Sequence, residues 1–259
     1  MRLRTSTAAV LAFLAATASV ALTGCGPQGV LGPVDVPAGS TAEGATTING
    51  PVTIGEGAKV GEAATVNGPL HMGAHSTVNS ARTVNGGVDV GEGARVTQDI
   101  DVVNGGIRLA KGADVGGAVR NVNGSIRIDS AHVAKGISTY TGDIELGNGT
   151  RVEGGIHVQK PDFDNDHNRT PRIVIGAGSV VEGTLKFDRD VKLLVSDAAK
   201  IGPVEGATAQ LFSGDDTNHI IEPAAAEVAP DAAPAPAADA GAKPAAPKPA
   251  PAAGTAQKQ

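Results

Sequence analysis

Aliphatic residues recur at every sixth position through the middle of the chain. A period of six fits neither the 3.6-residue repeat of a helix nor the simple alternation of an ordinary hairpin. It fits a chain wound as a prism, in which each short side points one aliphatic side chain inward. After two one-residue shifts and one interruption the pattern continues to Leu193, and a last partial frame ends at Ala207. Its first unbroken series is Ile48, Ile54, Val60, Val66, Met72, Val78, Val84, Val90, Val96 and Val102.

A recurring tripeptide, Val-Asn-Gly or Ile-Asn-Gly, gives the circumference of this prism. Its asparagines lie 18, 18, 19 and 19 residues apart, and three sides of six residues make a turn of 18. We therefore predict an all-β single-stranded parallel β-helix (β-solenoid) over residues 48–210, with turns about 4.8 Å apart. The two longer intervals predict single-residue bulges near 102–103 and 121–122. Stacked amides at one corner predict a hydrogen-bonded ladder of Asn49, Asn67, Asn85, Asn104 and Asn123.

One insertion, "PDFDNDHNRTP" at 161–171, interrupts the repeat. Asp162, Asp164 and Asp166 alternate as at the start of a calcium-binding loop. However, His167 and Ile173 stand where such a loop carries glycine and glutamate. The segment is therefore either a cation-binding loop or a polar surface loop.

The composition limits which side chains can fill the core and which partners are expected. The chain has 36 Gly, no Trp, one Tyr and four Phe, so the interior has to be filled by small and aliphatic side chains. The net charge of −6 disfavours nucleic acid as a partner, and stacking aromatic residues are scarce.

The N-terminal residues combine a basic "MRLR" with a short apolar stretch over 8–21, too short for a spanning helix. Leu22-Thr23-Gly24-Cys25 resembles the bacterial lipobox. The resemblance implies a lipoprotein signal peptide over 1–24, cleavage between Gly24 and Cys25, and acylation of Cys25. Acyl chains on Cys25 would anchor the protein in a lipid bilayer. Gly26 after the cysteine resembles outer-membrane sorting, which implies a lipid anchor in the outer membrane with the body on the periplasmic face.

Both flanks of the repeat are rich in small residues and proline. Residues 25–47 predict a flexible tether between the lipid and the solenoid. Residues 211–259 predict a linker followed by a disordered Ala/Pro-rich tail, because proline at that density opposes helix formation.

The repeat also resembles known solenoid families. The pattern [Leu/Ile/Val]-[Gly/Asn]-x-x-[Ala/Ser/Val]-x is similar to the hexapeptide repeat of left-handed β-helix acyltransferases. "VTIGEGAKVGE", "VDVGEGARV" and "IELGNGTRVEGGI" resemble bactofilins, which polymerise end to end without nucleotide. "TVNGGVDV" and "STYTGDIELG" resemble the putative-adhesin solenoids of bacterial envelopes. These resemblances imply the fold and leave the handedness open.

Hexapeptide-repeat acyltransferases carry a catalytic histidine on the flank of the solenoid. This chain has His71, His75, His132, His157, His167 and His219, without a convergent third partner at the spacing that a zinc site needs. We expect these to be surface side chains, and we expect no catalytic residue, bound metal or cofactor.

The sequence thus favours a non-catalytic envelope lipoprotein whose solenoid has a structural or scaffolding role. Its expected partners are the bilayer, further copies of itself and a cell-wall or envelope protein. Two alternatives remain open: an adhesin-like or surface binding module, and a hexapeptide-repeat-type acyltransferase.

Overall fold

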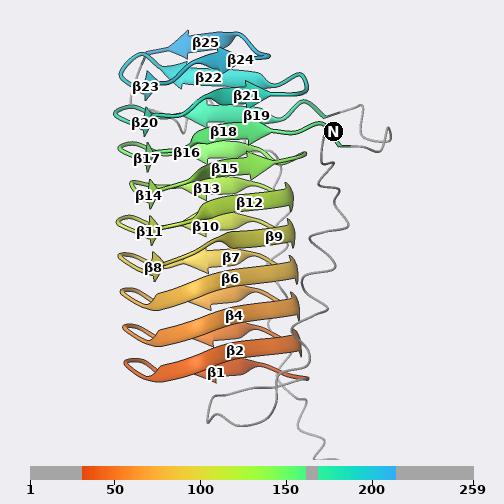
Figure 1. The fold of residues 1–259 in the computed structure, drawn as a ribbon, viewed down its shortest axis with the longest axis vertical. Coiled ribbons are helices and arrows are strands. Elements are labelled where there is room, and N and C mark those ends of the chain that lie inside the picture. The colour runs from red at the N-terminus through yellow and green to blue at the C-terminus, as the bar shows by residue number, and fades with distance from the viewer. Residues whose placement is uncertain (1–30, 162–168, 214–259) are drawn as a thin grey trace, which may run out of the picture. The chain divides into compact units, whose positions relative to one another are not determined.

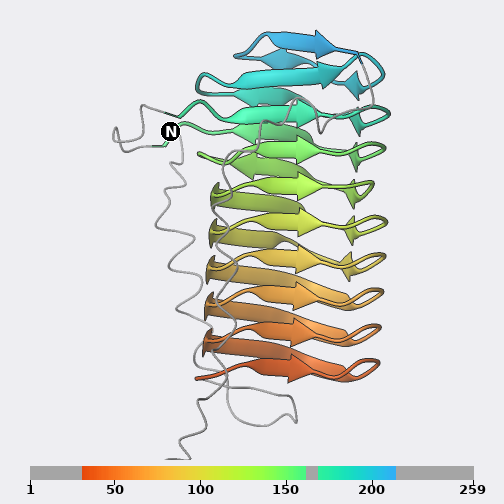
Figure 2. The same ribbon diagram turned by 180° about the vertical axis from the view of Figure 1, so that it is seen from behind.

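The computed structural model describes residues 31–161 and 169–213, which form a stack of parallel β-strands and contain no helix. The chain winds through three sides in each turn, and each strand pairs with the equivalent strand of the turns before and after it (Figures 1 and 2). Ten strands in the first side correspond to nine turns. The predicted all-β parallel β-solenoid is confirmed.

Side 1 is a ten-stranded parallel sheet. Val34 aligns with Val52, Val52 with Leu70 and Leu70 with Val88, so this side repeats in strict register. Its strands are β1 (Val34–Val36), β3 (Val52–Ile54), β5 (Leu70–Met72), β7 (Val88–Val90), β10 (Ile107–Leu109), β13 (Ile126–Ile128), β16 (Ile144–Leu146), β19 (Arg172–Ile175), β22 (Lys192–Ser196) and β25 (Ala209–Phe212).

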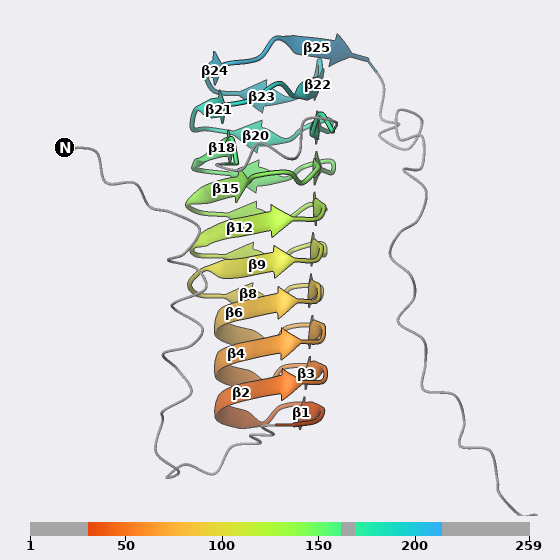
Figure 3. The ribbon, with the colours of Figure 1, turned by 90° about the vertical axis from the view of Figure 1, so that its right-hand side faces the viewer.

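Sides 2 and 3 together form the second sheet, of 15 strands. In the first turns, single long strands run through both sides: β2 (Thr41–Asn49), β4 (Lys59–Asn67) and β6 (Thr77–Asn85). In later turns each long strand is replaced by two shorter strands, one in side 2 and one in side 3. Side 2 then consists of β8 (Arg95–Val96), β11 (Asp114–Val115), β14 (His132–Val133), β17 (Arg151–Val152), β20 (Val180–Val181) and β23 (Lys200–Ile201). Side 3 consists of β9 (Ile100–Asn104), β12 (Ala118–Asn123), β15 (Gly136–Thr139), β18 (Gly155–Val158), β21 (Leu185–Phe187) and β24 (Val204–Glu205) (Figure 3).

The division of the strands has a simple cause. Val78 pairs with Val96, 18 residues on, but Ala81 pairs with Ile100, 19 residues on, so the extra residue lies between 96 and 100. It falls at the corner between β8 and β9, where it breaks the long strand. The bulges predicted near 102–103 and 121–122 are therefore misplaced, because the tripeptide spacing reports the length of a turn and not where the added residue sits.

The corners between the sides are formed by residues with positive φ. Glycines 57, 93, 112, 149 and 178 have φ between 63° and 72° at the corner between sides 1 and 2, where His75 (φ 57°) and Ser130 (φ 46°) take the same role. The glycine of each Val-Asn-Gly tripeptide forms the corner between sides 3 and 1, with φ between 120° and 157°. L-residues adopt these conformations at a cost, which explains why glycine recurs there.

The interior is narrow and aliphatic. Small and branched side chains from the three sides fill it in layers, and the largest fully buried ones are all Ile or Leu. This agrees with the composition, in which aromatic residues are scarce, although one of them, Phe187, is 4% exposed and belongs to the core. The largest fully buried residues are Ile54, Leu70, Ile100, Ile107, Leu109, Ile126, Ile128, Ile144, Leu146, Ile156, Ile173 and Ile175.

The predicted inward series is wrong at one position in each of the first five turns. Ile48 is 43% exposed, and the equivalent Val66, Val84, Val103 and Val122 are only partly buried. The residue just before each of them points inward instead, and in the first three turns it is threonine: Thr47, Thr65 and Thr83 are each 1% exposed. Because side chains alternate along a strand, the aliphatic residue after each threonine points outward.

The solenoid also begins earlier than expected. Residues 34–36 and 41–47, predicted to belong to the tether 25–47, form β1 and most of β2. Val34 and Val36 stack on Val52 and Ile54 and are 2% and 3% exposed. Glycine and proline in this stretch serve a turn of the solenoid, so composition alone misplaced the boundary. At the other end the last strand reaches Phe212, two residues beyond the expected limit of 210.

Candidate functional site

The outer face of side 3 carries two ordered series of polar side chains, a ladder of asparagines and a network of ion pairs. Its edge carries the asparagines of the tripeptides. Asn67 Nδ2 donates to Asn49 Oδ1 at 2.8 Å, and Asn85 Nδ2 donates to Asn67 Oδ1 at 2.9 Å. Asn104 and Asn123 continue the series with bonds of 3.0 Å each, and Thr141 Oγ1 donates to Asn123 Oδ1 at 2.5 Å. The five asparagines therefore form the ladder that their spacing predicts.

We expect Asn104→Ala to lower the free energy of unfolding by about 1 kcal/mol, because it removes one bond to Asn85 and one from Asn123. Thermal unfolding should show a decrease of roughly 3 °C. Asn104→Asp is the matched comparison: its carboxylate still accepts from Asn123 but sets an acceptor oxygen against Asn85 Oδ1, so its effect should be at least as large as that of Asn104→Ala. An unchanged melting temperature for Asn104→Ala would contradict a stabilising ladder.

A second polar series lies inside the same corner. Thr47 Oγ1 donates to the Gly32 carbonyl at 2.7 Å, Thr65 to that of Gly50 at 3.1 Å, and Thr83 to that of Gly68 at 3.2 Å. Asn121 takes this position further along the stack, where its amide donates to two glycine carbonyls. These bonds satisfy the buried threonine hydroxyls and the amide N–H groups of Asn121, whereas Asn121 Oδ1 is buried without a partner. The periodicity of hydrophobic residues cannot reveal this series, because its inward residues are polar.

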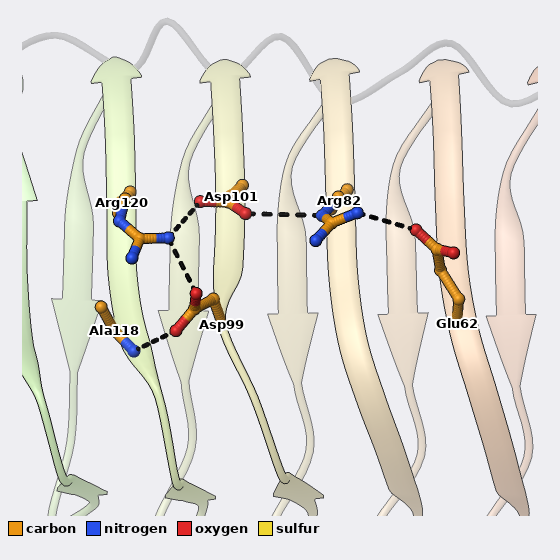
Figure 4. A network of polar contacts seen from close by, with 6 residues as sticks. All are labelled: Glu62, Arg82, Asp99, Asp101, Ala118 and Arg120. Atoms are coloured by element: carbon orange, nitrogen blue, oxygen red, sulfur yellow. Dashed lines mark hydrogen bonds and ion pairs between the residues drawn. The ribbon is translucent and has the colours of Figure 1, made fainter. Parts of the chain in front are cut away.

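A network of ion pairs crosses four successive turns of side 3 (Figure 4). Arg82 lies between Glu62, at 3.0 Å, and Asp101, at 3.5 Å. Arg120 Nη1 lies 3.0 Å from both Asp101 and Asp99. We call Glu62, Arg82, Asp101 and Arg120 the charged column. Its signs alternate from turn to turn, a pattern that opposite charges spaced 19 to 20 residues apart in the sequence could have indicated.

Asp99 is the most strongly held carboxylate of this network. Burial raises the pKa of Asp99, but the hydrogen bond from Ala118 N at 2.8 Å and the nearby Arg120 guanidinium outweigh that effect and keep it below its ordinary value. The pKa of Arg120 is raised: burial lowers it, and its bonds to Asp101 and Asp99 more than compensate. Both groups are therefore charged in the folded chain at neutral pH.

The lowered pKa of Asp99 predicts a pH-dependent stability. The contribution is complete above the unfolded-state pKa, near 3.9, and is lost as the pH falls through the lower folded-state value. Asp99→Asn keeps an acceptor for Ala118 N but removes the charge. We expect it to lower the melting temperature at pH 7 by about 2 °C and to reduce the decline of stability below about pH 4. Thermal melts between pH 7 and pH 2 measure this, and equal declines in both proteins would contradict it.

The histidines do not converge. His71 lies 3.1 Å from Asp89, His132 Nδ1 lies 2.7 Å from Asp114, and His157 Nε2 lies 2.7 Å from Asp188. The His157 contact is the main reason that the pKa of Asp188 is lowered. His75 forms a corner, and His167 and His219 lie outside the described residues. Each pairing joins neighbouring turns, and the acyltransferase interpretation stays an untested prediction.

A shallow depression of about 520 Å³ lies on the outer face of side 3, nearer the C-terminal end of the stack. Gly136 and Gly155 form part of its floor, and the positive side chains are Lys135 and Lys186. Lys186 and His157 both lie within ion-pair distance of Asp188. The remaining lining residues are Ala118, Ile137, Ser138, Ile156, His157, Thr184 and Glu205.

Several predicted sites lie outside the described residues: Gly24, Cys25, Asp162, Asp164 and Asp166. The base of the 161–171 loop is described, and there Arg169 Nη2 donates to Asp143 Oδ2 at 2.6 Å while Arg172 N donates to Asp143 Oδ1 at 2.9 Å. Within residues 31–161 and 169–213, no group of three or more His, Cys, Asp or Glu is arranged to hold a metal ion. The same residues include no helix with the length and apolar character needed to cross a membrane.

The fold defines this protein as a parallel β-solenoid. Comparisons with protein-family models, with curated proteins and with solved structures gave no match.

Proposed function

We propose that this chain is a bacterial envelope lipoprotein, anchored in the outer membrane through acylated Cys25, whose solenoid is a non-catalytic, self-associating scaffold. The observation that carries the proposal is the in-register stack of nine turns. Main-chain bonds, the asparagine ladder and the charged column all run along the stacking direction and tie each turn to the next. Such a body resists bending, which suits a structural role.

The C-terminal end of the stack supports self-association. Leu211 continues the inward series above Val195, which is 2% exposed, yet Leu211 itself is 74% exposed. Strands β23, β24 and β25 are the last of their sides and each has one unpaired edge in the described structure. An open edge beside an exposed apolar side chain is a template for pairing with another chain.

Cell fractionation tests the anchoring half of this proposal. The wild-type chain should sediment with outer membranes and carry acyl chains on Cys25 by mass spectrometry. Cys25→Ser should release the protein from the membrane fraction while the purified body keeps its β-sheet circular dichroism. Membrane association that persists in Cys25→Ser would rule out the lipid anchor.

The depression at Lys135, Gly136, Gly155 and Lys186 favours a second candidate, a surface binding module. Protease treatment of intact cells separates the two candidates. Digestion of the solenoid on intact cells would favour the binding module, whereas protection until the outer membrane is permeabilised would favour a periplasmic scaffold.

A further inference from the structure

One column of apolar side chains on side 3 is not used by the core. Ile48, Val66 and Val84 align in successive turns, since Thr47, Thr65 and Thr83 are paired in register and so are the asparagines that follow. Val103, Val122 and Tyr140 continue the series, and all six residues are exposed or only partly buried. We call Ile48, Val66, Val84, Val103, Val122 and Tyr140 the apolar column. Ile48 is exposed and the other five are partly exposed, so the row offers apolar surface to a partner.

Polar groups flank the apolar column on both sides. The asparagine ladder lies one residue further along each strand. Arg82, Asp101 and Arg120 of the charged column lie two residues earlier, and Glu62 lies four residues before Val66. Glu62, Arg82, Asp101 and Arg120 alternate in sign along the stack, and their side chains keep between 20% and 48% of their exposure. The face therefore combines an apolar stripe with an ordered pattern of charge.

We propose that this face docks against the same face of a second copy of the chain, with the two solenoids antiparallel. The proposal rests on the self-associating function proposed above and names its partner and geometry. The two-fold axis passes between the turn of Arg82 and the turn of Asp101. Contact along the sides in this way is distinct from pairing through the open C-terminal end.

Charge decides between the antiparallel and parallel arrangements. Reversal about this axis places Arg82 opposite the partner's Asp101, and Glu62 in the turn opposite the partner's Arg120. Arg82 and Asp101 then keep their partners within the chain, and each gains an opposite charge across the interface. The same reversal sets apolar column on apolar column and asparagine ladder on asparagine ladder. A parallel arrangement with apolar columns in contact would instead set the charged column against the partner's amides.

The area of this face indicates how stable the dimer is. Six turns about 4.8 Å apart and five strand residues of about 3.3 Å give a face of roughly 480 Å² per copy. Stable interfaces bury about 800 Å² per partner, so the dimer should be weak in dilute solution. Anchoring on a surface raises the effective concentration toward about the millimolar range and favours the same contact.

Cysteine cross-linking of the full chain carrying Cys25→Ser tests the geometry, since Cys25 is the only native cysteine. Two single variants, Val66→Cys and Val122→Cys, are made in this background, and the second carries an added tag so that a mixed dimer has its own mobility. In the antiparallel dimer, Val66 of one copy faces the partner copy's equivalent of Val122. Mixed at about 100 μM, a concentration suited to a weak interface, the two variants should form a mixed disulfide dimer at least about tenfold faster than either alone.

Each possible result of the cross-linking experiment either supports or overturns the antiparallel dimer. Faster cross-linking of Val66→Cys with itself would indicate parallel packing and would overturn the proposal. The proposal would also be overturned if Val122→Cys cross-linked with a His71→Cys control, on the outer face of side 1, as fast as it does with Val66→Cys. Val84→Asp should weaken the mixed cross-link at least about tenfold while leaving the circular dichroism unchanged. If cross-linking fails but sedimentation still shows oligomers, the lateral interface is wrong and the scaffold proposal stands. A strictly monomeric chain contradicts both.

Discussion

Gly124→Ala is expected to lower the melting temperature of the solenoid by about 10 °C or more, corresponding to a loss of about 4 kcal/mol. Gly124 has φ +120°, which an L-residue rarely adopts. An added Cβ would also overlap the carbonyl oxygen of Gly105 in the previous turn. The glycines of the tripeptide succeed one another along the stack, so relief would require the turns to separate and their main-chain bonds to break.

Gly57→Ala provides the matched control. Gly57 also has positive φ, +64°, but an added Cβ there meets no atom within 4 Å. Only the conformational penalty applies, so we expect a loss of about 1 kcal/mol. Thermal and urea unfolding of the two variants measure the difference. Equal losses would show that contact between turns does not govern the corner between sides 3 and 1.

Val119→Ala and Val122→Ala form the second pair, and they test the corrected orientation of β12. Both valines lie in one strand and lose the same atoms. Val119 is completely buried, so its replacement should cost about 2 kcal/mol or more through lost burial and the cavity left behind. Val122 belongs to the outward apolar column, so its replacement should change stability by less than about 0.5 kcal/mol.

Measurements at low micromolar concentration keep this comparison to the monomer, because Val122 also lies in the proposed dimer interface. A large loss for Val122→Ala together with a small one for Val119→Ala would restore the six-residue series as first predicted and remove the apolar column from the surface.

The repeat made most of the architecture predictable. Its interval of 18 or 19 residues indicated the length of a turn, the parallel stacking and the column of asparagines, because one property, position around the turn, governs all three. Val52, Ile54, Leu70 and Met72 are correctly predicted to point inward, because they are the first and last residues of three-residue strands whose middle residue points outward.

What the repeat could not give depends on local geometry. Thr47 points inward although it is polar, because its hydroxyl bonds to the Gly32 carbonyl, and this reverses the orientation of Ile48. The first turn was missed because glycine and proline are as common in corners as in tethers. The spacing of opposite charges could have indicated the charged column, but only the exact register of the strands brings Arg82 and Asp101 within 3.5 Å.

Sedimentation velocity of the full chain carrying Cys25→Ser, from about 1 to about 100 μM, tests the central claim most directly. A self-associating scaffold predicts a sedimentation coefficient that rises with concentration and falls when salt screens the charged column. A single monomeric species across the whole range, with the β-sheet circular dichroism intact, would contradict it.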